Sequence, residues 1–123
     1  MHSSVSRLDP LNASGSLKKE IVAKLNKSKV GKPRQAATLY EQVLSTDLLS
    51  RRDRGYFLAR LASALALTGE PDESAGTGLQ AMELAVATGS QRTKRELGRT
   101  LRTLRPWRSR PVPRQLGEAL AAQ

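Results

Sequence analysis

The fold of this chain is decided by residues 58–86, LARLASALALTGEPDESAGTGLQAMELAV. Leucines at positions 58, 61 and 65 follow the spacing of one helical face, and Gly69 is a residue type that often ends helices. Pro71 favours the first turn of a second helix, because proline lacks the N–H group that has no partner there. The stretch therefore predicts two helices joined by a short turn.

Helix signals continue on both sides of this stretch. Upstream, Ser50 stands three residues before Asp53, in the Ser-x-x-acid pattern of a helix start. Downstream, Ser90 is expected to cap a helix that ends near Arg105, because a proline follows. Three more helices are expected at 17–30, from Pro33 onward and at about 113–121, with apolar stripes formed by Leu17, Ile21, Leu25, Ala36, Tyr40, Val43, Leu44, Leu116 and Leu120.

No segment shows the alternating pattern of a strand, because β-branched and aromatic residues are scattered. The sequence predicts an all-α protein of about five or six helices. Residues 105–113 contain three prolines and are expected to be non-helical. We expect residues 17–121 to form a single helical-repeat domain, preceded by a disordered leader at 1–16.

The helices repeat along the sequence. Gly31 and Gly69 begin Gly-x-Pro turns 38 residues apart, and the pairs Leu61-Ala62 and Leu97-Gly98 are 36 residues apart. A period near about 34 residues with two helices per unit is typical of tetratricopeptide arrays. Small side chains are expected to let antiparallel helices approach closely at Ala62, Ser74, Ala81 and Gly98.

The unit at residues 58–86 resembles a tetratricopeptide repeat in its large and small positions, Leu58, Leu61, Ala62, Leu65, Gly69, Ser74 and Ala81. The resemblance extends over about residues 31–104 and departs at Leu65 and Gly78, where the family favours aromatic side chains. It implies an array of antiparallel helix pairs.

The string from Leu48 to Arg108 is also similar to the C-terminal tetratricopeptide-like region of actinobacterial helix-turn-helix transcriptional regulators. That resemblance implies a regulatory module that binds proteins or peptides, or that mediates dimerisation. Residues 1–30 are too short to form the DNA-binding domain that precedes the array in that family, so we do not expect direct, sequence-specific DNA binding.

Composition argues against most catalytic and metal chemistry. The 123 residues include no cysteine and one histidine, His2, which excludes thiolate zinc sites and leaves little material for histidine catalysis. The triplet Gly76-Thr77-Gly78 lies inside a predicted helix, where its glycines are expected to relieve packing rather than to bind phosphate. No apolar run is long enough to cross a bilayer. We expect a soluble, cytoplasmic protein that is not an enzyme and needs no metal or cofactor.

Charge suggests what the protein binds. The net charge is +10, and residues 90–123 contain nine basic side chains against Glu96 and Glu118. Four arginines share one face of the helix after Ser90, and the tetratricopeptide resemblance places that face in a concave groove opposite a wall formed by Tyr56, Ala59, Ser63 and Ala66. Because a guanidinium matches a carboxylate in shape and charge, we expect an acidic peptide or protein segment as the ligand. Its anchors would be Arg92, Arg95, Arg99 and Arg102, with Tyr56 and Ser63 shaping the opposite wall.

Other interpretations of the basic residues remain open. The arginine face has the pattern of any solvated amphipathic helix. Nucleic acid is an alternative partner, through the lysine-rich first helix and the segment around the tryptophan, with Trp107 either stacking on a base or anchoring the turn. Exposed apolar residues on the end helices, Leu17, Ile21, Leu116 and Leu120, also suggest a homodimer. The nucleic-acid candidates are Lys18, Lys19, Lys24, Lys27, Trp107, Arg108 and Arg110.

Overall fold

The structure, a computed structural model, describes residues 32–123. Within this range the chain forms α-helices and one short 3-10 turn, and it contains no strand. The predicted all-α class is therefore confirmed. The leader expected at 1–16 and the helix expected at 17–30 lie outside the described residues. The elements are α3 (Pro33–Leu44), α4 (Arg51–Leu67), α5 (Pro71–Thr88), α6 (Gln91–Thr103), η1 (Arg105–Trp107) and α7 (Pro111–Ala121).

The predicted helix boundaries are confirmed where a capping residue marked them. The side chain of Ser50 accepts a hydrogen bond from the backbone N–H of Asp53 at the start of α4, and Ser90 caps α6 in the same way through Thr93. Pro71 occupies the first turn of α5, and Gly69 follows the end of α4 in the left-handed conformation at φ 80°. These signals are local, so the sequence alone positions them.

The proline-rich segment was predicted wrongly in one respect. Residues 105–107 form a 3-10 turn, and α7 begins at Pro111 rather than at about 113. A proline fits the first turn of a helix because the N–H groups there need no helical partner. Prolines at 106 and 111 therefore start short helical elements instead of preventing them.

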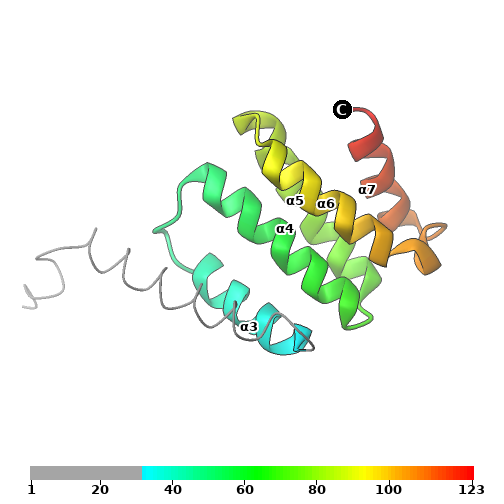
Figure 1. Cartoon of the computed structure of the whole chain (residues 1–123), viewed down its shortest axis with the longest axis horizontal. Helices are drawn as coiled ribbons and strands as arrows, with labels where there is room; N and C mark the ends of the chain where they lie inside the picture. The colour runs from blue at the N-terminus through cyan, green and yellow to red at the C-terminus, as the bar shows by residue number, and fades with distance from the viewer. Residues whose placement is uncertain (1–31) are drawn as a thin grey trace, which may run out of the picture.

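The helix α4 lies at the centre of the arrangement. It packs against α3 on one side and α6 on the other, while α5 contacts α4, α6 and α7. Figure 1 shows α4 and α6 side by side, with α5 behind them and α7 at the far end from α3. The hydrophobic core follows the same arrangement of helices. One cluster joins α3 to α4 through Tyr40 and Phe57. Two further clusters join α4, α5, α6 and α7, and they include Ala59, Met82, Leu97 and Leu116.

Small residues bring α4, α5 and α7 close together. Ala62, Ser74 and Ala81 are fully buried, and the hydroxyl of Ser74 donates to the carbonyl of Ala62 over 2.6 Å. A Cβ added at Gly78 would lie 2.8 Å from Cδ2 of Leu116. The expected close packing is confirmed at these positions.

The same expectation is wrong at Gly98 and Gly76, where an added Cβ would meet no atom within 4 Å. Sequence reasoning also missed Gly55, whose added Cβ would lie 3.0 Å from Cβ of Leu84. Gly55 comes before the repeat unit at 58–86, so the comparison of repeat positions gave no reason to expect close packing there. Across the described part of the chain, none of the helices combines the length and apolar character needed to span a membrane.

Candidate functional site

A pocket of about 440 Å³ lies between α3, α4 and α6. Its walls come from three helices, of which α6 is distant in sequence from the other two. Tyr40 lies on α3, Arg60 and Ser63 lie on α4, and Glu96 and Arg99 lie on α6. The pocket exists because α4 packs against both α3 and α6, which brings these side chains together.

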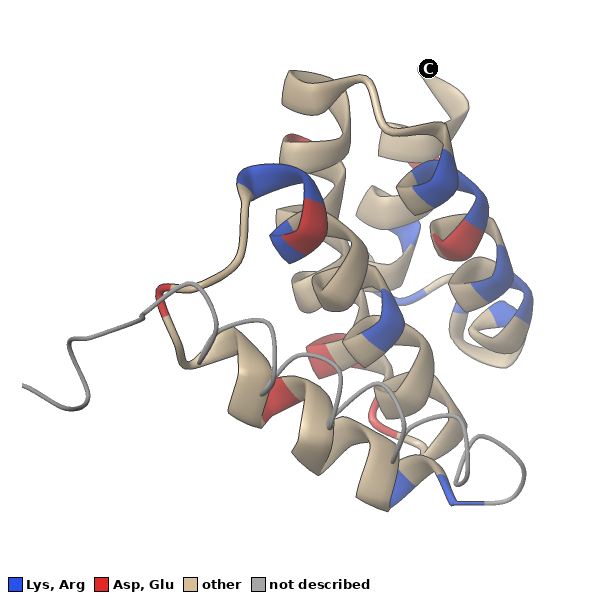
Figure 2. Cartoon of the chain, turned by 60° about the vertical axis from the view of Figure 1, so that its left-hand side comes forward, with Lys and Arg blue, Asp and Glu red and all other residues tan. Residues whose placement is uncertain are grey.

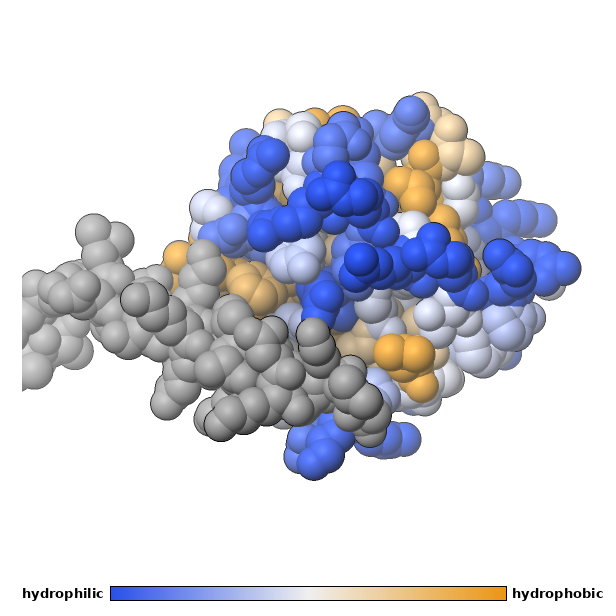
Figure 3. All heavy atoms as spheres, in the orientation of Figure 1, coloured by the Kyte–Doolittle hydropathy of each residue, from blue (hydrophilic) through white to orange (hydrophobic). Residues whose placement is uncertain are grey.

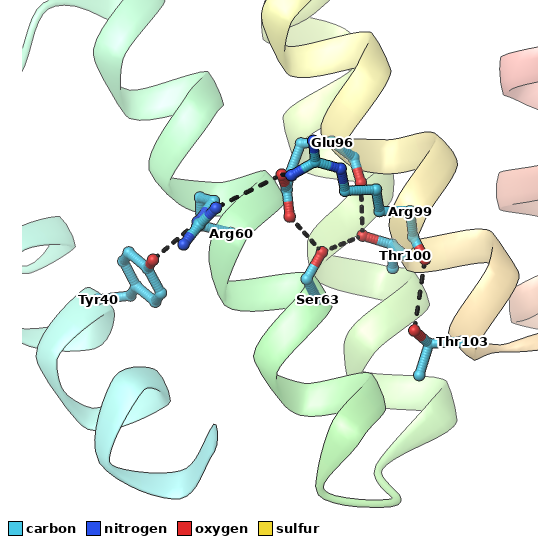
Figure 4. Close-up of polar contacts among 7 residues, drawn as sticks. All are labelled: Tyr40, Arg60, Ser63, Glu96, Arg99, Thr100 and Thr103. Carbon is cyan, nitrogen blue, oxygen red and sulfur yellow. Dashed lines mark hydrogen bonds and ion pairs between the residues drawn. The ribbon is translucent and has the colours of Figure 1, made fainter. Parts of the chain in front are cut away.

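Glu96 is the acidic centre of the pocket. It is only 6% exposed, and its carboxylate accepts a hydrogen bond from the Ser63 hydroxyl over 2.7 Å. The same hydroxyl lies 2.7 Å from the hydroxyl of Thr100, which also donates to the Glu96 carbonyl. Figure 4 shows these side chains pointing toward one another across α4 and α6. A buried carboxylate needs such partners, because moving its charge out of water costs free energy unless hydrogen bonds or opposite charges replace the lost hydration.

Two guanidinium groups complete the partners of Glu96. Arg60 Nη1 lies 3.6 Å from Oε1 of Glu96, and Arg99 Nη1 lies 3.4 Å from the same oxygen. The Arg60 side chain is 28% exposed and that of Arg99 is 65% exposed, so both can still be reached from the surface. One carboxylate therefore faces two positive charges.

Arg60 also ties the pocket to α3. Its Nε donates to the Tyr40 hydroxyl over 2.8 Å, as Figure 4 shows. Burial alone would lower the pKa of Arg60, but the hydrogen bond with Tyr40 and the negative charge of Glu96 outweigh it, so this pKa is raised above its ordinary value. Burial raises the pKa of Tyr40, against the opposing effect of Arg60. At neutral pH the pair is thus a charged guanidinium donating to a neutral phenol.

The four arginines predicted as anchors all have exposed side chains on α6. Figure 2 shows the helix carrying several basic positions and a single acidic one. Only Arg99 lines the pocket. Arg92 instead stacks 3.9 Å above the ring of Tyr56 and lies 3.7 Å from the Asp53 carboxylate. Arg95 and Arg102 make no ion pair or hydrogen bond with another side chain in the part of the chain that the structure describes.

The opposite wall differs from the prediction. Ser63 lines the pocket, but Tyr56 is held under Arg92 and does not contribute to it. Ala59 and Ala66, also expected on this wall, are 0% and 2% exposed and belong to the core. The groove side of α4 is instead formed by Arg60, Ser63, Ala64 and Leu67. Successive helical residues differ by about 100° in direction, so an alignment that is off by one residue turns a wall residue into a core residue.

The residues of the nucleic-acid alternative are only partly described. Lys18, Lys19, Lys24 and Lys27 lie outside the described residues. Trp107 packs against the cluster formed by Ala66, Ala75, Leu104 and Leu116. Arg110 lies 3.3 Å from the Asp72 carboxylate, and Arg108 donates to the carbonyl of Arg105. Trp107 therefore anchors the turn after α6, which is one of the two roles that the sequence suggested for it.

Sequence reasoning missed Arg60, Glu96 and Tyr40 as a connected group. One available signal was that Glu96 is the only acidic residue between positions 90 and 117. A second was that Arg60 and Glu96 are separated by 36 residues, the same interval as the Leu61-Ala62 and Leu97-Gly98 pairs. Equivalent positions in neighbouring repeats are expected to lie side by side, which predicts a pair of opposite charge.

The arrangement has the chemistry of a binding site for an anion. Among the described residues, no group of three or more histidine, cysteine, aspartate or glutamate side chains is placed to hold a metal ion. The polar groups of the pocket are one ammonium, two hydroxyls, two guanidiniums, a phenol and one carboxylate that is already paired. Comparison of the chain with protein-family models, with curated proteins and with solved structures gives no match.

Proposed function

We propose that this chain is a non-catalytic, tetratricopeptide-like interaction module, linked to transcriptional regulation, that binds an acidic peptide or protein segment between α3, α4 and α6. The observation that carries the proposal is the pairing of one buried carboxylate, Glu96, with two accessible guanidiniums, Arg60 and Arg99. The link to regulation is supported by the resemblance of residues 48–108 to regulator C-terminal regions.

Charge supports this class of ligand. Glu96 neutralises one of the two guanidiniums beside it, so a positive charge remains in a partly desolvated pocket. Arg95 and Arg102 extend the positive surface along α6, on either side of Arg99 in the sequence. A guanidinium carries five N–H donors and no acceptor. An incoming carboxylate therefore finds donors that the protein itself does not saturate.

The test is a titration of a fluorescein-labelled peptide of ten residues, four of them Asp and the rest Gly and Ser, against the full chain. Replacing both Arg95→Glu and Arg99→Glu is expected to weaken binding at least about tenfold, because attraction at two positions becomes repulsion. The matched control is Arg105→Glu with Arg114→Glu, which makes the same change in net charge at exposed positions away from the pocket.

Labelled duplex DNA is titrated in parallel to separate the nucleic-acid alternative. Both ligands weaken with salt, so salt dependence alone does not distinguish them. The proposal is wrong if the Arg95/Arg99 reversal leaves peptide binding intact, or if the control pair weakens it equally. It is also wrong if no peptide binding is measured at low salt, since the arginine face would then be a solvated surface.

A further inference from the structure

The pocket has an apolar half that the acidic-ligand proposal does not use. Leu67, at the end of α4, is 64% exposed, the highest of the three large exposed apolar side chains in the described part of the chain. It lines the pocket together with Pro33, Ala36 and Ala64. Figure 3 shows an apolar patch beside the hydrophilic band that crosses this face, near the C-terminal end of α4. An exposed leucine is common, but one that borders a hollow with other apolar side chains can be covered by a ligand.

The two halves of the pocket lie in order along α4. Arg60 belongs to the cationic half, and Leu67 stands seven residues later on the same helix. A rise of about 1.5 Å per residue separates their backbone positions by roughly 10 Å. A peptide in the extended polyproline II conformation covers about the same length in three residues, at roughly 3.1 Å each, and its three-residue turn places side chains three positions apart on the same face. Ser63 lies between the halves, and its hydroxyl is already engaged by Glu96 and Thr100.

We infer that the pocket selects an extended peptide segment in which an acidic residue and a large aliphatic residue are three positions apart. The acidic side chain contacts Arg60 and Arg99, and the aliphatic side chain covers Leu67, Ala64 and Pro33. This inference rests on the proposed function, because it names the class of segment that the same pocket takes. It adds that charge alone is not sufficient for tight binding.

Charge complementarity favours an acidic partner over the chain's own N-terminal segment. Residues 17–31 carry five lysines and one acidic residue, Glu20. Lys32, Arg60 and Arg99 all line the pocket, so a lysine-rich occupant would place like charges together. A segment that brings carboxylates instead reduces the excess positive charge.

The inference is tested with three labelled ten-residue peptides of Gly and Ser that differ at two positions. One carries Asp and Leu three residues apart, the second carries the same pair in reverse order, and the third carries Asp with Ser in place of Leu. Covering a leucine side chain is expected to make the better of the first two bind roughly tenfold more tightly than the third. Leu67→Ser is expected to remove that advantage and to leave the affinity of the Asp/Ser peptide unchanged.

The unchanged Asp/Ser affinity also shows that Leu67→Ser has folded, and Leu67→Ala serves as a second variant with a milder loss. Val86→Ser is the matched control, since Val86 is 52% exposed and lies on α5, away from this pocket. Arg99→Gln is expected to weaken all three peptides.

If Arg99→Gln weakens the peptides but Leu does not improve binding, the inference is wrong while the proposed function stands. If Arg99→Gln has no effect on any peptide, both fail. The inference is also overturned if affinity for the Asp/Leu peptide falls as the protein concentration is raised, because a second copy of the chain would then occupy the apolar half.

Discussion

At the scale of single residues, Glu96 determines the character of the pocket. A carboxylate that is 6% exposed is retained in a protein only when hydrogen bonds and opposite charges replace its water. Here Ser63 supplies the hydrogen bond, and Arg60 and Arg99 supply the charges. Glu96 therefore joins α4 to α6 and also holds the two guanidiniums near the surface.

We predict that Glu96→Gln destabilises the folded protein by about 1 to 3 kcal/mol, because the buried amide cannot replace the charge that Arg60 and Arg99 face. Denaturant unfolding followed by circular dichroism measures the change. Glu118→Gln, at an exposed position on α7, is the control and is expected to change the free energy of unfolding by less than about 0.5 kcal/mol. Equal effects of the two substitutions would show that Glu96 contributes nothing beyond a surface charge.

Ionisation of the Tyr40 hydroxyl makes the free energy of unfolding depend on pH in the alkaline range. Burial raises the pKa of Tyr40 above its ordinary value of 10.0, although Arg60 opposes the shift. The folded protein thus holds this proton more tightly than the unfolded chain, so the contribution is present below about pH 10 and is lost as the pH rises through the folded-state pKa.

We predict that Tyr40→Phe has a free energy of unfolding that falls less steeply than that of the wild type between about pH 9 and pH 11. The same denaturant titrations, repeated across this range, provide the measurement. Parallel pH profiles for the two proteins would contradict the assignment to Tyr40.

At the scale of elements, two glycines on α5 have opposite roles. A Cβ at Gly78 would lie 2.8 Å and 3.3 Å from the two methyl carbons of Leu116, and Leu116 is fully buried and cannot easily move. A Cβ at Gly76 would meet nothing within 4 Å. The first glycine allows α7 to approach α5, whereas the second only weakens the helix.

We predict that Gly78→Ala destabilises the protein by about 1 to 3 kcal/mol through overpacking. Gly76→Ala is expected to stabilise it by about 0.5 to 1 kcal/mol, because alanine favours the helical backbone. Thermal unfolding of the two variants beside the wild type measures both effects, and shifts of the melting temperature in the same direction would contradict the interpretation.

Helix boundaries could be predicted because their signals are local. Ser50, Ser90, Pro71 and Gly69 each act within one turn of their own position. The pocket could be predicted only in part. Arg99 and Ser63 were expected there, whereas Arg60 was not, because the direction of its side chain depends on how α3, α4 and α6 are rotated against one another. Glu96 was noticed only as an isolated acid, since a pattern of charges does not show which side chain is buried.

At the scale of the whole molecule, the expected homodimer loses part of its basis. Leu116, one of the apolar residues expected to pair between chains, is 0% exposed and packs in the core of its own chain. Leu120 is partly buried against the cluster formed by Ala59, Ala81, Met82 and Leu97. Leu17 and Ile21 lie outside the described residues.

The dimer stays a prediction, and light scattering at tens of micromolar is expected to give twice the mass of the 13.4 kDa chain. Combining Leu17→Lys with Ile21→Lys is expected to give the monomer, because charged side chains would oppose pairing of the apolar stripe. A monomeric mass for the wild type would contradict the prediction.

The helix α3 packs chiefly against α4, whereas α4 and α5 contact several neighbours each. Among the described residues, α3 is attached to α4 by one apolar cluster, by the Tyr40–Arg60 hydrogen bond and by a bond from Arg54 to the carbonyl of Leu44, and Arg54 also donates to the carbonyl of Thr46 just after α3. An element that packs against fewer neighbours in the described part of the chain is expected to open before the rest of the molecule unfolds. Amide protons of α3 should therefore exchange with deuterated water sooner than those of α4 and α5, and a ligand that bridges Tyr40 and Arg99 should slow that exchange at a distance from its own contacts.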